Sequence, residues 1–142
     1  MTTTTHVEAL DRAMHSANVW LKEIKGELGT DDAHRAYQAL RTTLHALRDR
    51  LPPEEATHLG AQLPLLVRGV YYDGWKLAGK PVTIRKKEEF LEWVRSEVAD
   101  PAFDPEAAAR AVFRVLDRRV TAGEVADVRH ALPQAIRELW PK

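Results

Sequence analysis

The sequence contains no cysteine, and this absence excludes disulfide bonds, thiolate metal sites and cysteine nucleophiles. Serine nucleophiles are also scarce, since the chain has only two serines, Ser16 and Ser96. No apolar run approaches the roughly 18 residues of a membrane helix. The polar N-terminal segment does not resemble a signal peptide, so we expect a cytoplasmic protein with no membrane partner.

The chain also lacks an excess of charge of either sign. Its 21 basic residues balance 21 acidic residues, which gives a formal net charge of zero. A general attraction to nucleic acid or acidic membranes is therefore not expected. The 142 residues, 44% hydrophobic and 30% charged, suffice for one ordinary domain with a buried core.

Sequence motifs for enzyme chemistry are missing. Neither serine lies in a Gly-x-Ser-x-Gly turn, and the glycines do not have the spacing of a phosphate-binding loop. The paired carboxylates at 31–32, 54–55 and 88–89 lie at expected helix starts, where capping explains them. We therefore favour a protein that is not an enzyme and has no cofactor, although an enzyme without a recognisable motif stays open.

The histidines do not predict a metal site. His34 and His45 share a helix face but are eleven residues apart, which places them about 16 Å from each other along the axis. His45 and Asp49, at i and i+4, could supply two ligands, and His58 could approach them from the next helix. No complete ligand set such as HExxH exists, so we expect these histidines at the surface or at helix ends.

Apolar residues recur every three or four positions, a pattern typical of amphipathic helices. With the caps and prolines, this pattern predicts six helices at about residues 6–28, 31–51, 53–72, 87–99, 105–119 and 122–139. The first helix is expected to bury one stripe of residues: Leu10, Met14, Ala17, Leu21, Ile24 and Leu28. Residues 73–86 contain two glycines and a proline without a helical period, which indicates a loop.

The two halves of the chain align with each other at an offset of 69 residues. Four pairs of charged residues coincide in this alignment, as do two Leu-Pro dipeptides at 63–64 and 132–133. The charged pairs are Arg41 with Arg110, Arg50 with Arg119, Glu55 with Glu124, and Arg68 with Arg137. We interpret this as an all-α tandem repeat of two three-helix units, 8–72 and 87–140, joined by a linker loop at 73–86 and packed as one globular domain.

Pro64 and Pro133 lie inside otherwise helical patterns. Each lacks an amide hydrogen and crowds the carbonyl four residues back, at Gly60 and Arg129. The third helix of each unit is therefore expected to be kinked or broken just before its proline. We favour a kink that wraps the helix around its own bundle over one that turns freed carbonyls toward a ligand. The matched charges are expected to form ion pairs between helices, or else to line a symmetric anion site.

Large aromatic residues near the linker are not explained by helical periodicity. They are followed by a basic segment, residues 76–87, that contains no acid before Glu88. The candidate binding residues are Tyr71, Tyr72, Asp73, Trp75, Lys80, Arg85, Lys86 and Lys87. These residues could anchor a protein partner, stack bases and hold phosphates, or fix the linker between the two bundles.

Several of these segments resemble the bacterial family catalogued as domain of unknown function 2267. The resemblance covers about residues 15–141 and rests on the segments 39–51, 54–55, 62–64, 68–75, 90–91, 132–133 and 139–141. Its most specific parts are the Tyr-Tyr-Asp-Gly-Trp run and the repeated Leu-Pro. The resemblance implies a small all-helical cytosolic bacterial protein and brings no activity, cofactor or catalytic residue.

Two functional hypotheses follow from the sequence. The first is a non-enzymatic protein-interaction or scaffold module that binds a protein partner, or a second copy of itself, through the groove between the units. The alternative is the binding of nucleic acid or another anionic ligand through the aromatic and basic linker, residues 71–87.

Overall fold

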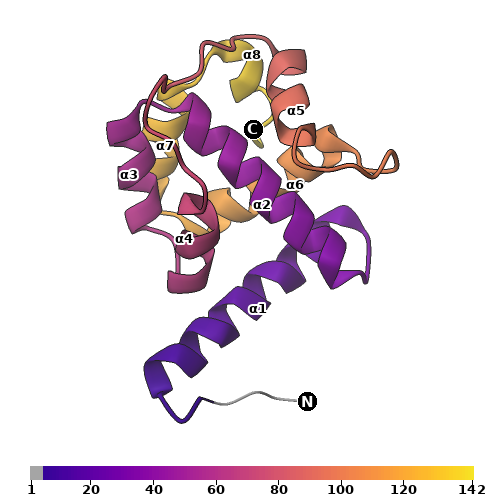
Figure 1. Ribbon diagram of the computed structural model, residues 1–142, viewed down its shortest axis with the longest axis vertical. Coiled ribbons are helices and arrows are strands. Elements are labelled where there is room, and N and C mark those ends of the chain that lie inside the picture. The colour runs from indigo at the N-terminus through magenta and orange to yellow at the C-terminus, as the bar shows by residue number, and fades with distance from the viewer. Residues whose placement is uncertain (1–4) are drawn as a thin grey trace.

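The computed structural model describes residues 5–142, in which all regular secondary structure is helical (Figure 1). The all-α class is therefore confirmed. The helices are α1 (Glu8–Leu28), α2 (Ala33–Arg50), α3 (Pro53–Ala61), α4 (Leu65–Tyr72), α5 (Lys87–Arg95), α6 (Pro105–Arg119), α7 (Ala122–Ala131) and α8 (Gln134–Arg137). None of the helices between residues 5 and 142 combines the length and apolar character needed to cross a bilayer.

The expected count of six helices is wrong, because the described residues form eight. Each helix that was expected to be kinked or broken at a proline is in fact divided into two. α3 ends before Pro64 and α4 begins after it, while Pro133 separates α7 from α8 in the same way. Both prolines adopt ψ angles near +150°, 157° at Pro64 and 149° at Pro133, so the backbone leaves the helical region there and restarts one residue later.

The second half of α2 is the centre of the molecule (Figure 1). All residues from Thr42 to Asp49 are buried, and α2 packs against α1, α3, α4, α5 and α6. Side chains from both predicted units form one connected core, which includes Ile24, Leu44, Leu47, Tyr71, Phe90, Phe113, Leu116 and Trp140. The core is thus shared across the expected boundary between the units.

Several helix contacts repeat in matched pairs when α1–α4 are exchanged with α5–α8, although the contacts of α4 with α2 and α3 have no equally extensive counterpart at α8. α2 packs on α6, and α3 packs on α7. The contact of α1 with α6 has its counterpart in α2 with α5, and that of α1 with α4 has its counterpart in α5 with α8. This pattern supports the duplication, which we retain as a proposal in a revised form with four helices in each copy.

The apolar stripe expected on α1 is buried only in the second half of that helix. Ile24 is fully buried, whereas Leu10 is 44% exposed and Met14 is 40% exposed. The reason is visible in Figure 1, where the first turns of α1 extend away from the other helices. The period identified the helix correctly but could not show how far its neighbours reach.

Residues 73–86 contain no helix and run along α2. The amide of Val82 donates to the carbonyl of Asp49 at 2.9 Å. The Nε of Arg50 donates to the carbonyl of Ile84 at 2.6 Å. These two contacts fasten the segment to the C-terminal end of α2.

Gly60 on α3 allows α4 to approach closely, because a Cβ atom at this position would collide with the hydroxyl and ring of Tyr72. We predict that Gly60→Ala lowers the free energy of unfolding by about 1–3 kcal/mol through overpacking. Gly26 on α1 is the matched control, since a Cβ atom there meets nothing within 4 Å. Gly26→Ala should raise stability by about 0.5–1 kcal/mol, as alanine does in a helix. Urea unfolding measures both, and equal effects of the two variants would contradict the close approach.

Candidate functional site

A cluster of buried polar side chains lies on the otherwise apolar interior side of α2. His45 is 4% exposed, Arg48 is 4% exposed and Asp49 is 7% exposed. Buried charges are costly unless they are paired and hydrogen-bonded, so their partners define the site. Above them lies a cavity of about 250 Å³, lined by Arg41, His45, Arg48, Asp49, Asp73, Gly74, Trp93, Ser96 and Glu97.

Arg48 joins α2 to the chain that follows α4. Its Nη1 donates to the carbonyls of Tyr71 and Asp73, both at 2.9 Å. Its Nε donates to Oδ1 of Asp49 at 2.9 Å, and the other oxygen of Asp49 accepts from the indole Nε1 of Trp93 at 3.0 Å. The buried charge pair therefore holds both the end of α4 and the face of α5.

His45 is held between two acceptors. Its Nε2 lies 2.7 Å from the carbonyl of Val70, and its Nδ1 lies 2.8 Å from Oε2 of Glu97. A carbonyl can only accept, so Nε2 carries a hydrogen. The contact with Glu97 then needs a second proton, held either on Nδ1 or on the carboxyl. The pair is a fixed, proton-bridged link between α2 and α5.

Arg41 closes one edge of the cavity. It lies 3.0 Å from Asp73 and 3.7 Å from the second oxygen of Glu97. Burial disfavours its charge, but hydrogen bonds with Asp73 and Tyr37 outweigh burial and raise the pKa of Arg41. Each of the three carboxylates in the cavity thus lies near an arginine, Asp49 near Arg48, and both Asp73 and Glu97 near Arg41.

The groups in the cavity are engaged with one another rather than available for nucleophilic chemistry. The hydroxyl of Ser96 donates to the carbonyl of Trp93 at 2.6 Å, and both ring nitrogens of His45 are occupied. At the rim, two aromatic side chains reach solvent: Tyr37 is 37% exposed and Trp93 is 36% exposed.

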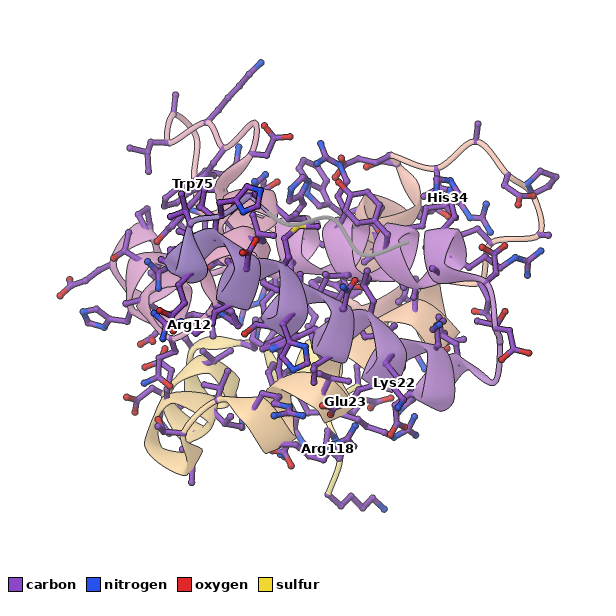
Figure 2. All side chains as sticks on the ribbon, turned by 90° about the horizontal axis from the view of Figure 1, so that it is seen from below. Arg12, Lys22, Glu23, His34, Trp75 and Arg118 are labelled. Atoms are coloured by element: carbon purple, nitrogen blue, oxygen red, sulfur yellow. The ribbon has the colours of Figure 1, made fainter. Side chains whose placement is uncertain are left out.

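The aromatic residues expected at the site hold the loop against the core. Tyr71 is fully buried, its hydroxyl donates to the carbonyl of Ala56 at 2.6 Å, and burial raises the pKa of its phenol. Tyr72 contacts Tyr71 edge-on and stacks on Trp75 with 5.6 Å between ring centroids. Figure 2 shows Trp75 at the base of a projecting loop. Of the eight candidate binding residues predicted from the sequence, only Asp73 lines the cavity of about 250 Å³.

The basic residues expected at the site lie apart from the cavity. Lys80 is half-buried, and Arg85 and Lys86 are exposed. Lys87 forms ion pairs with Glu106 at 3.8 Å and Glu138 at 3.6 Å, which link α5 to α6 and α8. The structure therefore divides the sequence candidates between a packing cluster, a basic surface and an interhelical ion pair.

The matched arginines act in different ways. Arg110 pairs with Glu106 on its own helix and donates to the carbonyl of Glu138 at 3.3 Å, whereas Arg41 pairs with the carboxylates of Asp73 and Glu97. Arg68 donates through Nη2 to the carbonyl of Leu63 at 2.8 Å, and Arg137 donates through Nη2 to the carbonyl of Leu132 at 2.9 Å. Each guanidinium thus bonds a carbonyl next to a proline break.

The matched glutamates meet where α3 packs on α7. Burial raises the pKa of Glu124 to about 8, and a hydrogen bond and repulsion from Glu55 and the charge of Asp127 act in the same direction. Glu124 is only 8% exposed, and neither Glu55 nor Glu124 has a partner for its Oε2 atom. Glu124 therefore keeps its proton near neutral pH beside Glu55 instead of forming an ion pair with arginine.

Sequence reasoning missed Arg48, Trp93 and Glu97. A signal was available for Trp93, because it lies outside the apolar stripe of its helix, Phe90, Leu91, Val94 and Val98. The i, i+4 relation of His45 and Asp49 was noticed, but each has other partners. Among residues 5–142, no three histidine, aspartate or glutamate side chains come together as a metal site.

Comparison with known proteins gives one match. The sequence profile of a family described as "Uncharacterized conserved protein (DUF2267)" matches residues 17–139. No curated protein matches the chain.

The carboxyl pair predicts an unusual dependence of stability on pH. The folded state holds a proton on Glu124 up to about pH 8, whereas an unfolded glutamate releases it near 4.5. The free energy of unfolding should therefore fall as pH rises between these values and level off above them. Glu124→Gln should remove most of this slope and raise stability at pH 8.5 by about 1–3 kcal/mol.

Urea unfolding at pH 5.5, 7 and 8.5 measures this dependence. Glu54→Gln is the control, because Glu54 is exposed on the same turn of α3 as Glu55. If the free energy of unfolding depends on pH in Glu124→Gln as steeply as in the wild type, Glu124 is not the group that holds the proton.

Proposed function

We propose that this chain, which belongs to the family of uncharacterised conserved proteins DUF2267, is a non-enzymatic protein-interaction module. Its binding surface is the rim of the α2–α5 cavity, formed by Tyr37, Arg41 and Trp93. The observation that carries the proposal is the partial exposure of two aromatic side chains beside an arginine, over a cavity whose inner groups are already bonded.

The composition of the rim supports protein binding. Tryptophan, tyrosine and arginine are the residue types that contribute most binding energy in protein interfaces. Tyr37 and Trp93 come from different helices, and Arg41 contacts Tyr37 and also Glu97, which lies four residues after Trp93. A partner that extends across α2 and α5 could cover both rings and the guanidinium.

The hydrogen bonds among Trp93, Asp49 and Arg48 also support the proposal. Trp93 is held by its hydrogen bond to Asp49, which Arg48 fixes in turn. A ring held in this way loses little conformational entropy when a partner covers it. The same bonding leaves His45 and Ser96 without a free proton-transfer partner, which favours binding over catalysis.

We predict that Trp93→Ala weakens binding of a protein partner by about 10- to 30-fold, the loss of about 2 kcal/mol typical of a central aromatic. The assay compares proteins retained by the immobilised wild-type chain and its variants, followed by titration of each retained partner. Trp93→Phe keeps a ring without the hydrogen bond to Asp49, so it distinguishes the effect of losing the ring from the effect of losing that hydrogen bond.

Leu77→Ala is the matched control, because Leu77 is 61% exposed and lies away from this rim in the 73–86 segment. The proposal is wrong if every retained partner binds Trp93→Ala and Leu77→Ala equally well. Sedimentation over a range of concentrations tests the case in which the partner is a second copy.

A second candidate, binding of nucleic acid through residues 71–87, is favoured by one specific observation. Arg50 is bonded to the linker, and burial followed by repulsion from Arg85 lowers its pKa. The described residues provide no carboxylate within 4 Å of either guanidinium. Two arginines near each other without a counter-charge favour an anionic ligand.

Fluorescence anisotropy with mixed single-stranded oligonucleotides tests this candidate. Binding should weaken steeply with salt, and Arg85→Gln should reduce the slope of log K against log salt by about one phosphate contact. Arg12→Gln is the control, since Arg12 pairs with Glu8 on exposed α1. Affinity that does not depend on salt would remove nucleic acid from consideration.

A further inference from the structure

The C-terminal helices α7 and α8, coloured yellow in Figure 1, border two hollows that share the same two arginines. The first hollow, of about 510 Å³, is lined by Asp117, Ala122, Val125, Ala126, Arg129, His130 and Arg137. The second, of about 250 Å³, is lined by Arg129, Gln134, Arg137, Glu138, Trp140 and Lys142. Because Arg129 and Arg137 line both, they lie where the hollows adjoin.

Both guanidinium groups are held by the backbone but are not neutralised. Arg129 donates through Nη1 to the carbonyl of Pro141 at 2.8 Å, and Arg137 donates through Nη2 to the carbonyl of Leu132 at 2.9 Å. Within residues 5–142, neither has a carboxylate oxygen within 4 Å, whereas Arg110, Arg114, Arg118 and Arg119 nearby on α6 all do. Two fixed cations without a counter-charge form a prepared site for an anion.

Unsatisfied donors lie at the same place. The Nε of Arg137 and the indole Nε1 of Trp140 are buried and have no hydrogen-bond partner. Trp140 is 3% exposed, so its indole cannot turn to bulk water without leaving the core. A buried donor without an acceptor costs about 1–3 kcal/mol, which is why such groups are rare and call for an explanation. Both groups are donors that lack an acceptor within the described part of the protein, and both belong to residues that line the second hollow.

The acidic residues around the hollows do not neutralise Arg129 and Arg137. Glu138 lies 3.6 Å from Lys87, which takes up its charge. Asp117 is exposed on α6 and pairs with neither arginine. Lys142 adds a further cationic side chain to the second hollow.

The matched position in the first half shows what is different here. Beside the break at Pro64, Arg68 donates through both Nε and Nη2, to the carbonyls of Gly60 and Leu63. Beside the break at Pro133, Arg137 donates only through Nη2, and its Nε has no partner. The alignment places Arg129 where the first half has Gly60, so the second half carries an additional guanidinium beside its break. The extra cation is not explained by closing the break, which Arg68 does alone.

We propose that the α7–α8 hollows form a binding site for a phosphate oxyanion, held between the guanidinium groups of Arg129 and Arg137. The ligand is either inorganic phosphate or the phosphate group of a small monoester. In the second case, the rest of the molecule lies against the apolar wall of Ala122, Val125 and Ala126. This site is separate from the aromatic rim on α2 and α5, and its test does not depend on that proposal.

Titration with inorganic phosphate, followed by ¹H–¹⁵N spectra, tests the site. The four tryptophan indoles give four resolved signals, and Trp140→Phe assigns the one from Trp140. We expect saturable movement of the Trp140 signal with a Kd at or below about 1 mM. At 10 mM phosphate, the midpoint of thermal unfolding should rise by about 3 °C relative to chloride at equal ionic strength.

Arg129→Gln and Arg137→Lys should each weaken binding by at least about tenfold. Arg137→Lys retains a charge and a donor for the break, so it guards against loss of α8, and circular dichroism checks the fold of each variant. Arg12→Gln, on exposed α1, is the control for net charge and should bind as the wild type does. O-phosphoserine distinguishes the two sources, because tighter binding than inorganic phosphate identifies a monoester ligand.

Two results would overturn the site. The first is the absence of any saturable shift of the Trp140 indole up to 20 mM phosphate. The second is an equal response to chloride at the same ionic strength, or equal binding by Arg129→Gln and Arg12→Gln, either of which would mean general screening of charge.

Discussion

The structure depends on the burial of the second half of α2 on every side. Eight consecutive residues, Thr42 to Asp49, are buried, although the two helical turns they form include His45, Arg48 and Asp49. Buried polar groups of this kind are costly unless they have hydrogen-bond partners. The end of α4, the face of α5 and the segment after Tyr72 are held by hydrogen bonds to these polar groups. The cavity above α2 lies between the elements held in this way.

Much of the fold could be predicted, because helix starts and stops are local. One helix ends at Leu28, before the left-handed Gly29, and another begins at Pro105, after the capping Asp104, and both bounds are those expected. The count of helices could not be predicted, because a proline permits either a kink or a full break and the outcome depends on tertiary contacts. Here Arg68 and Arg137 hydrogen-bond the backbone at the breaks, and this favours separate helices.

Less of the site could be predicted, because its residues are brought together by contacts distant in sequence. Arg41 and Asp73 were both singled out, but nothing local showed that they pair with each other. Amphipathic periodicity assigns charged residues to solvent, so it gives no sign that Arg48 is buried. The matched glutamates show the same difficulty: opposite charges were expected as their partners, and the actual partner of Glu124 is the equivalent carboxyl, Glu55, on α3.

The attachment of residues 73–86 to α2 has a consequence for the covalent continuity of the chain. A helix-free segment between two groups of helices would ordinarily be a tether whose cleavage releases them. Here Val82 and Ile84 are bonded to Asp49 and Arg50, and Leu44 and Phe113 belong to one core. Cutting the peptide backbone at the glycine-containing tip, near Gly79, would therefore leave two fragments that complement each other and remain associated, as the pieces of a split protein do.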